Sequence, residues 1–152
     1  MTDNHLYSPF VTATRNVFQL MLDLSDVSDR SVENFVCDNE LNISIGVIGD
    51  LTGEVIYRFP DTTSLNMVKI MSNMEMDVVD DFVTSAISEI ANIISGNALT
   101  ILSEGDLTCD ILPPALVVHD DSKEYAMRTN CCISTSEGDV CLEICLNPAI
   151  SL

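Results

Sequence analysis

The sequence predicts an α+β fold, in which helices pack on one antiparallel sheet within a single domain spanning residues 1–152. Two long segments, Pro9–Leu24 and Asp77–Leu102, place apolar residues at helical spacing. Several shorter segments have the alternation and the turn residues of strands joined by hairpins. A chain of this length can bury a substantial core without disulfides or a structural metal.

Acidic residues outnumber basic residues by 24 to 6, which gives a formal net charge of −18. Such a surface repels phosphate backbones and anionic lipids, so we expect neither nucleic acid nor a membrane as a partner. It suits a partner with a basic rim or an exposed lysine. The alternative, that the charge only keeps an apolar chain dissolved, stays open at this point.

No run approaches the ~20 apolar residues of a membrane span, and the first residues lack a signal-peptide pattern. We therefore expect a cytoplasmic protein. In that compartment the six cysteines are expected to be reduced thiols rather than a disulfide framework.

The first half of the chain predicts a helix followed by a hairpin. Ser8 and Pro9 suit the N-cap and the first position of a helix that runs to Leu24. The acidic segment Ser25–Asn39 is expected to be a loop or an irregular strand. The hairpin then consists of two strands and their glycine-rich turn, Asn42–Ile48, Glu54–Phe59 and Gly49–Gly53.

Two further helices are expected in the middle of the chain. Pro60 ends the hairpin, and Asp61, Thr62 or Thr63 caps a short helix that ends near Met71. The long helix Asp77–Leu102 follows, with aspartates in its first turns, and Gly105 closes it.

The long helix is predicted to be amphipathic. Its core-facing side is expected to hold Val79, Phe82, Val83, Ala86, Ile90, Ile93, Ile94 and Ile101. Ser85, Glu89, Asn92 and Gly96 lie at i, i+4, i+7 and i+11, so they share one line along the other side. Asn97 falls on the apolar side, where we expect a hydrogen-bonded core asparagine beside a close helix approach at Gly96. By itself, an exposed Glu-x-x-Asn pattern is ordinary for a solvated helix face.

The last third of the chain is predicted to be β-rich. Pro113 and Pro114 indicate a sheet edge or a bend, and Ser136–Asp139 indicates a hairpin turn. The expected strands are Leu107–Leu112, Ala115–Val118, Tyr125–Thr135 and Val140–Asn147. In the last strand Val140, Leu142, Ile144 and Leu146 are expected to face the core, with Cys141, Glu143 and Cys145 on a partly open face.

The residues that carry metal or nucleophilic chemistry do not form a recognisable motif. The cysteine spacings differ from zinc knuckles, so buried apolar roles are favoured, with Cys132 near Cys141 or Cys145 across the hairpin. His119 is expected at a strand end beside Asp120 and Asp121, as a surface residue. No metal site is predicted.

The helix from Ser85 to Ala98 resembles the signature helix of the CheC/CheX/FliY chemotaxis phosphatases. That signature has Asp or Ser, then Glu four residues on and Asn three further, with a proline some twenty residues later. Ser85, Glu89 and Asn92 match it, and Pro113 or Pro114 takes the proline's place. Segments 9–18 and 53–60 also resemble the family's first helix and second strand, so the resemblance covers nearly the whole chain. A single motif copy makes it more similar to CheX than to CheC.

The resemblance implies a hydrolase of two-component signalling that removes phosphate from the aspartate of a CheY-like response regulator. Asn92 would orient the attacking water, and Glu89 would pair with the regulator's active-site lysine. Ser85, Ser88 and Gly96 would be peripheral partner contacts. The regulator would bring its own Mg²⁺, so no cofactor is expected here.

The family also implies a signature helix exposed on one side and a homodimer formed through sheet edges, for which the C-terminal hairpin offers an edge. The alternative function is a non-catalytic module that binds a regulator or the deamidase CheD. A regulator outside chemotaxis is a further possibility for the phosphatase reading.

Overall fold

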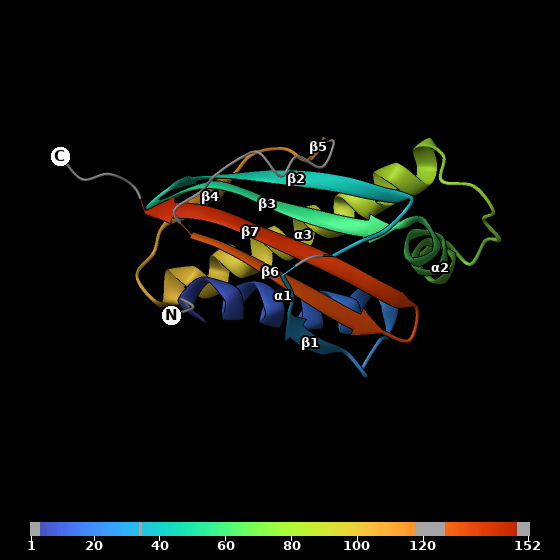
Figure 1. Ribbon diagram of the computed structural model, residues 1–152, viewed down its shortest axis with the longest axis horizontal. Coiled ribbons are helices and arrows are strands. Elements are labelled where there is room, and N and C mark those ends of the chain that lie inside the picture. The colour runs from blue at the N-terminus through green and yellow to red at the C-terminus, as the bar shows by residue number, and fades with distance from the viewer. Residues whose placement is uncertain (1–3, 34, 118–126, 149–152) are drawn as a thin grey trace.

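In the computed structural model, which describes residues 4–33, 35–117 and 127–148, helices cover one face of an antiparallel sheet (Figure 1). The strand order is β1-β6-β7-β3-β2-β4, and β5 also pairs with β2. The helices are α1 (Asn4–Leu22), α2 (Asp61–Ser72) and α3 (Asp81–Glu104). The strands are β1 (Ser28–Ser31), β2 (Glu40–Gly49), β3 (Leu51–Pro60), β4 (Cys109–Ile111), β5 (Ala115–Leu116), β6 (Met127–Thr135) and β7 (Gly138–Pro148).

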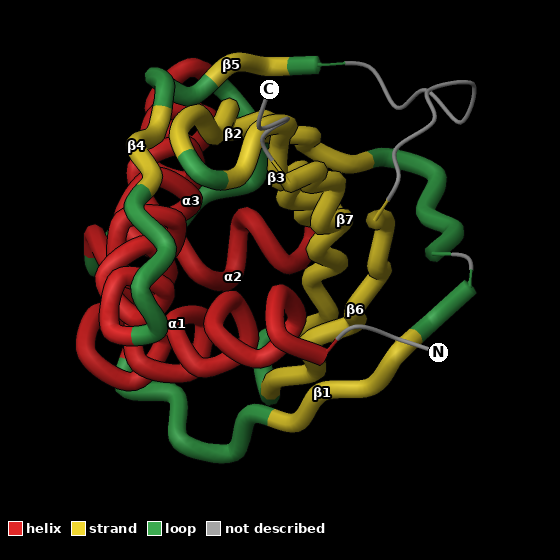
Figure 2. Tube along the Cα trace, turned by 90° about the vertical axis from the view of Figure 1, so that its left-hand side faces the viewer, coloured by secondary structure: helices red, strands yellow, loops and turns green. Residues whose placement is uncertain are grey.

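The helices and the sheet form two layers (Figure 2). Helices α1 and α3 lie along the face of the sheet that we call the inner face, and α2 lies across one end of it. We call the opposite face the outer face. The predicted α+β class, with helices packed on an antiparallel sheet, is confirmed.

The core lies between α1, α3 and the inner face. Alternating residues of β7 enter it as predicted, and all are buried: Val140, Leu142, Ile144 and Leu146. Phe10 and Phe18 of α1 meet them from the helix layer and are also fully buried. Phe-sized side chains dominate the free energy of such a core because each removes a large apolar area from water.

The first predicted hairpin is confirmed as β2–β3, with strands longer than expected. Both glycines that flank its turn have a positive φ, 118° at Gly49 and 142° at Gly53. A Cβ on Gly49 would lie 2.6 Å from the carbonyl oxygen of Thr108, and one on Gly53 2.1 Å from that of Cys145. Only glycine fits at these two positions, because both the backbone angle and the packing exclude a side chain.

Two helix starts differ from the prediction. Helix α1 begins at Asn4, so Pro9 lies inside it and Ser8 is not its N-cap. A proline near a helix start removes only one backbone bond, which the following buried turns offset. Helix α2 has Pro60 at its N-cap and no side-chain cap. The N–H of Asp61 instead donates to the carbonyl of Asn39 at 3.0 Å, so a side-chain cap is not needed.

Helix α3 begins at Asp81, four residues later than predicted. The carboxylate of Asp80 accepts a hydrogen bond from the N–H of Val83 at 3.0 Å and caps the helix. Because an N-cap residue is non-helical, the acidic residues before Asp80 belong to the preceding loop. At the other end Gly105 is the C-cap, as predicted, and its N–H bonds to the carbonyl of Leu102.

One buried hydrogen bond joins α3 to the sheet. The hydroxyls of Tyr57 on β3 and Ser95 on α3 lie 2.7 Å apart, and both side chains are fully buried. A buried hydroxyl without a partner costs ~1–3 kcal/mol, so this pair favours one rotation and one axial position of the helix. The helix therefore presents a defined side to solvent.

The predicted C-terminal strands are placed at two positions in the sheet. Strands β4 and β5 both pair with β2, and Pro113 and Pro114 separate them, so this is an edge as predicted. The β6–β7 hairpin, expected to offer an edge for dimerisation, is covered in part, because β1 pairs with residues 131–134 of β6. Strand β7 lies between β6 and β3, and β1 pairs with β6. His119, Asp120 and Asp121 lie outside the described residues.

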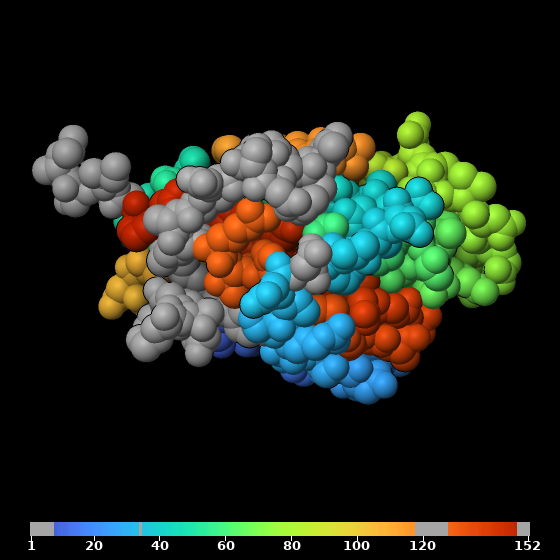
Figure 3. Space-filling view, in the orientation of Figure 1, coloured from blue at the N-terminus to red at the C-terminus, as the bar shows by residue number. Residues whose placement is uncertain are grey.

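The outer face is buried, not partly open as predicted. Cys141, Glu143 and Cys145 are each no more than 2% exposed. Residues 32, 33 and 35–39 run over part of this face (Figure 3), and Phe35 lies 5.2 Å from the Arg58 guanidinium. The covering segment is remote in sequence, so strand periodicity alone gave no sign of it.

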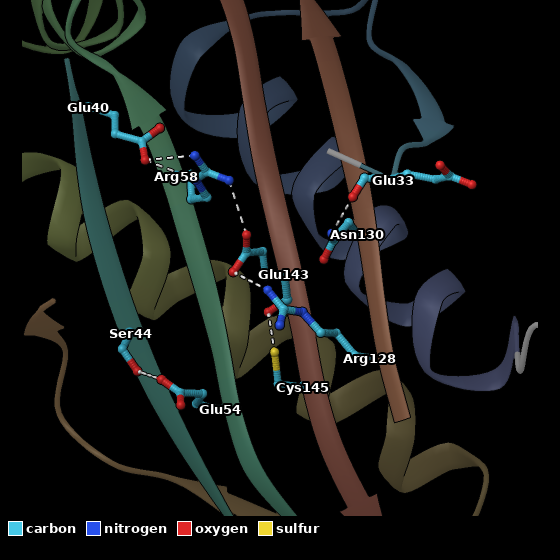
Figure 4. A network of polar contacts seen from close by, with 9 residues as sticks. All are labelled: Glu33, Glu40, Ser44, Glu54, Arg58, Arg128, Asn130, Glu143 and Cys145. Carbon is cyan, nitrogen blue, oxygen red and sulfur yellow. Dashed lines mark hydrogen bonds and ion pairs between the residues drawn. The ribbon is translucent and has the colours of Figure 1, made fainter. Parts of the chain in front are cut away.

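Ion pairs neutralise the charges under that cover (Figure 4). Arg58 bonds to Glu40 at 2.9 Å and to Glu143 at 3.1 Å, and Arg128 lies 3.4 Å from Glu143. Buried charges require such partners because an unpaired ion in the interior is very costly. Cys132 is directly opposite Cys141, as predicted, whereas Cys145 is opposite Arg128.

We expect Tyr57 and Ser95 to be energetically coupled. Ser95→Ala should cost ~1–3 kcal/mol because it leaves the Tyr57 hydroxyl buried without a partner. Tyr57→Phe should cost less, since a helical serine can donate to a carbonyl one turn earlier. The double variant should be less destabilised than the sum of the two, as measured by urea unfolding. Simple additivity would show that the pair does not hold α3.

We also expect alkaline destabilisation. Burial, reinforced by Glu143, raises the pKa of the Cys141 thiol from its ordinary value of 9.0 to about 12, and burial raises the pKa of Tyr57. A folded-state pKa above the unfolded value stabilises the fold below pH 9 and loses that stabilisation as the pH rises toward 12. The unfolding free energy should therefore fall by up to ~1.4 kcal/mol per pH unit per group, above pH 9 for Cys141 and above pH 10 for Tyr57. Chemical melts from pH 7 to pH 11 measure it, and Cys141→Ala should reduce the slope; an unchanged slope would contradict the assignment.

Candidate functional site

The polar line predicted on the long helix lies on α3. Ser85 and Glu89 are exposed, and Asn92 and Gly96 are partly exposed. We call these four residues the exposed stripe. Ser88, one residue before Glu89, is partly exposed beside it. Helix α3 runs on the side of the sheet opposite the face seen in Figure 3.

The remaining circumference of α3 is anchored. The residues that face the sheet and α1 are buried: Val83, Ile87, Ile90, Ala91, Ile94, Ser95, Ala98 and Leu102. Small residues among them, such as Ala91 and Ala98, allow close approach of the helix to its neighbours. Together with the Asp80 cap and the Tyr57–Ser95 bond, this packing holds the exposed stripe on a rigid element.

The two central groups of the stripe are free to act on another molecule. Neither the Glu89 carboxylate nor the Asn92 carboxamide takes part in a hydrogen bond or ion pair within the described residues. At 1.5 Å rise per residue they lie ~4.5 Å apart along the helix axis. The carboxylate can pair with a cation, and the carboxamide can both donate and accept a hydrogen bond.

Gly96 differs from what the sequence indicated. A Cβ added to this glycine would have nothing within 4 Å, so the fold does not need glycine here. The expected close approach within the chain is therefore wrong. Asn97, expected in the core, is partly exposed at the flank of α3, where water can satisfy its amide.

Two apolar residues assigned to the core lie on the exposed side. Phe82 is 49% exposed and Ile93 is 36% exposed. The other six residues of the predicted face are buried or pack against the core, so only these two assignments were wrong. Ile87, which the prediction omitted, is fully buried. A helical projection shows the signal that was missed: Phe82, Glu89 and Ile93 lie at i, i+7 and i+11, on one line with the stripe.

Two kinds of feature were not found among the described residues. No group of three or more His, Cys, Asp or Glu side chains among the described residues is placed to hold a metal ion. Within the same part of the chain, no helix is long and apolar enough to cross a membrane.

These features define an α+β domain with one anchored helix whose exposed side carries an unengaged carboxylate and carboxamide. The model of the family "Chemotaxis phosphatase CheX" matches residues 41–136, a range that includes all but the first residue of β2, all of β3 and α3, and Pro113 and Pro114. The chain belongs to this family.

Its relatives agree in sequence and in fold. The CheY-P phosphatase CheX of Thermotoga maritima is 28% identical over 114 residues, which cover 71% of this chain and 74% of the relative. CheX of Borrelia burgdorferi, solved in a CheX-CheY-BeF3-Mg²⁺ complex, superposes with a TM-score of 0.80 at 22% identity over 97% and 99% of the two chains. CheX of Vibrio vulnificus superposes with a TM-score of 0.81 at 22% identity over 93% and 96%.

We expect Gly96→Ala to stabilise the protein. Alanine has the higher helix propensity by ~0.5–1 kcal/mol, and its methyl group would contact nothing within the described chain. Thermal unfolding of the two proteins measures the difference. A lower melting temperature for the variant would mean that Gly96 has a role inside the fold.

Proposed function

We propose that this chain hydrolyses the aspartyl phosphate of a CheY-like response regulator. The observation that carries the proposal is the pair of unengaged side chains, Glu89 and Asn92, on an anchored helix. Membership of the CheX family and likeness to a relative named CheY-P phosphatase support the same reaction. The proposed reaction requires no nucleophile, base or metal of this chain's own, because the regulator supplies the phosphoryl group and its surroundings.

Asn92 is proposed as the catalytic residue. Its carboxamide would orient a water molecule in line with the phosphorus–oxygen bond of the regulator's aspartyl phosphate. The water oxygen forms the new bond to phosphorus, the bond to the aspartate oxygen breaks, and the products are inorganic phosphate and the free carboxylate. Phosphoryl transfer of this kind requires mainly positioning, which a polar group on a rigid helix can supply.

Glu89 is proposed to dock the regulator. Its carboxylate would pair with the regulator's active-site lysine and so place Asn92 one helical turn further along. Ser85, Ser88 and Gly96 are proposed as peripheral contacts on the same side of α3. The Borrelia complex contains Mg²⁺ together with CheY. We propose that here too the regulator carries the ion, which would offset charge at the phosphoryl group.

Two broader expectations accompany this proposal. Response regulators act in the cytoplasm, so we place the reaction there. We also keep a homodimer formed through sheet edges as a proposal. Since β7 is internal, the edges available for it among the described strands are β1 and the β4–β5 side.

Substituting the two central residues should separate their roles. Asn92→Ala should lower kcat for phosphate release at least ~100-fold with little change in binding, because it removes a group that acts in the transition state. Glu89→Ala should weaken binding and hydrolysis together. Phosphate release from receiver domains charged with acetyl phosphate measures activity, and calorimetry with the BeF3-treated regulator measures binding.

Two exposed helical residues of the same types, an asparagine and a glutamate, provide matched controls. Asn16→Ala changes an exposed asparagine on α1, and Glu104→Ala an exposed carboxylate at the end of α3. Both should behave like the wild type. If the Asn92→Ala and Glu89→Ala variants released phosphate from the regulator at the wild-type rate, the site assignment would be wrong. Tight binding without accelerated hydrolysis by the wild-type protein would instead identify a non-catalytic binding module.

A further inference from the structure

Two exposed apolar side chains lie on either side of Glu89 on α3. Phe82 lies two helical turns before it, and Ile93 lies one turn after it. At 1.5 Å rise per residue these are axial separations of ~10 Å and ~6 Å. All three residues share one line of the helix, as in helices that use i, i+7 and i+11 positions as anchors for a partner.

The fold does not account for this placement. Single exposed apolar residues are normal on a protein surface, but the eight buried positions of α3 already fill its core-facing side. Phe82 and Ile93 point away from that side. Gly96 lies on the same surface and lowers helix propensity where a methyl group would meet nothing. The surface is thus apolar at two points and recessed at a third, a shape that another protein can cover closely.

The charge pattern identifies what covers it. Helix α3 contains three charged residues, and all are acidic: Asp81, Glu89 and Glu104. Glu89 lies ~12 Å along the axis from Asp81 and ~22 Å from Glu104. A single carboxylate between two apolar contacts is complementary to a single cation with an apolar rim, because covering the rim excludes water and strengthens the pairing. A receiver domain with one active-site lysine has this chemistry, whereas a polybasic segment would need several carboxylates.

We propose that Phe82 and Ile93 are the apolar anchors with which this chain docks the receiver domain, one on each side of the Glu89–lysine pair. The inference rests on the proposed function and adds the residues that determine partner affinity. The anchors act in binding and not in the chemical step, since neither carries a polar atom that could reach the phosphoryl group.

The test separates binding from chemistry. Phe82→Ala, Ile93→Ala and the double variant are assayed with the receiver domain that the wild-type protein dephosphorylates fastest. That domain is phosphorylated with acetyl phosphate in the presence of Mg²⁺. The double variant should raise KM at least ~10-fold while kcat at saturation changes less than ~2-fold, the signature of lost binding shared by ground and transition states. Leu20→Ala, which truncates an 82% exposed residue of α1, is the matched control and should leave both constants unchanged.

Binding is also measured without hydrolysis, by calorimetry with the BeF3-treated receiver domain. The double variant should bind at least ~10-fold more weakly than the wild type, with an unchanged melting temperature. An unchanged KM and binding constant, or a loss confined to kcat, would overturn the inference. If the wild-type protein bound the receiver domain but accelerated no hydrolysis, the proposed function would fail, and weaker binding by the double variant would still support the anchors.

Discussion

The position of α3 on the sheet is the constraint on which the candidate site depends. Burial of the apolar side of α3 supplies most of the free energy that holds the helix on the sheet. Apolar packing by itself, however, tolerates small rotations and axial shifts of the helix. The hydrogen bond between Tyr57 and Ser95 disfavours such movements, because a shift of the helix would leave two hydroxyls unpaired in the core. The Asp80 cap sets where the helix begins. Together they decide which side chains face solvent, and thereby which can meet a partner.

The outer face of the sheet is closed at its centre, in contrast to the exposed side of α3. Strands β3 and β7 carry Arg58 and Glu143 there, both buried, and Phe35 packs over Arg58. Arg58 pairs with Glu40 and Glu143, and Arg128 pairs with Glu143. These four charged side chains therefore have partners within the fold. The sheet is therefore covered on both faces in its centre. Of the two layers, only the helices present a free, rigid polar line to solvent among the described residues.

Local chemistry explains which parts of the fold could be predicted. The β2–β3 and β6–β7 hairpins were predicted because turn residues and alternation lie within a few residues of one another. The start of α3 was placed too early because aspartates favour both the first turn and the N-cap, and only the bond to Val83 distinguishes the two roles. The burial of the outer face could not be predicted, since Phe35, which packs over Arg58 there, lies about 100 residues before β7 in the sequence.

The sequence by itself determined the elements, their amphipathic character and the identity of the polar groups, because each depends on neighbours within one or two turns. It placed Ser85, Glu89 and Asn92 on one line of a helix, and its resemblance to the chemotaxis phosphatases indicated that this line is a phosphatase motif. Only the tertiary structure decided that Cys141 and Cys145 are buried on the outer face of the sheet, which strand alternation left partly open. The physical reason is that an apolar side chain is buried only where another element covers it, and that cover comes from distant parts of the chain.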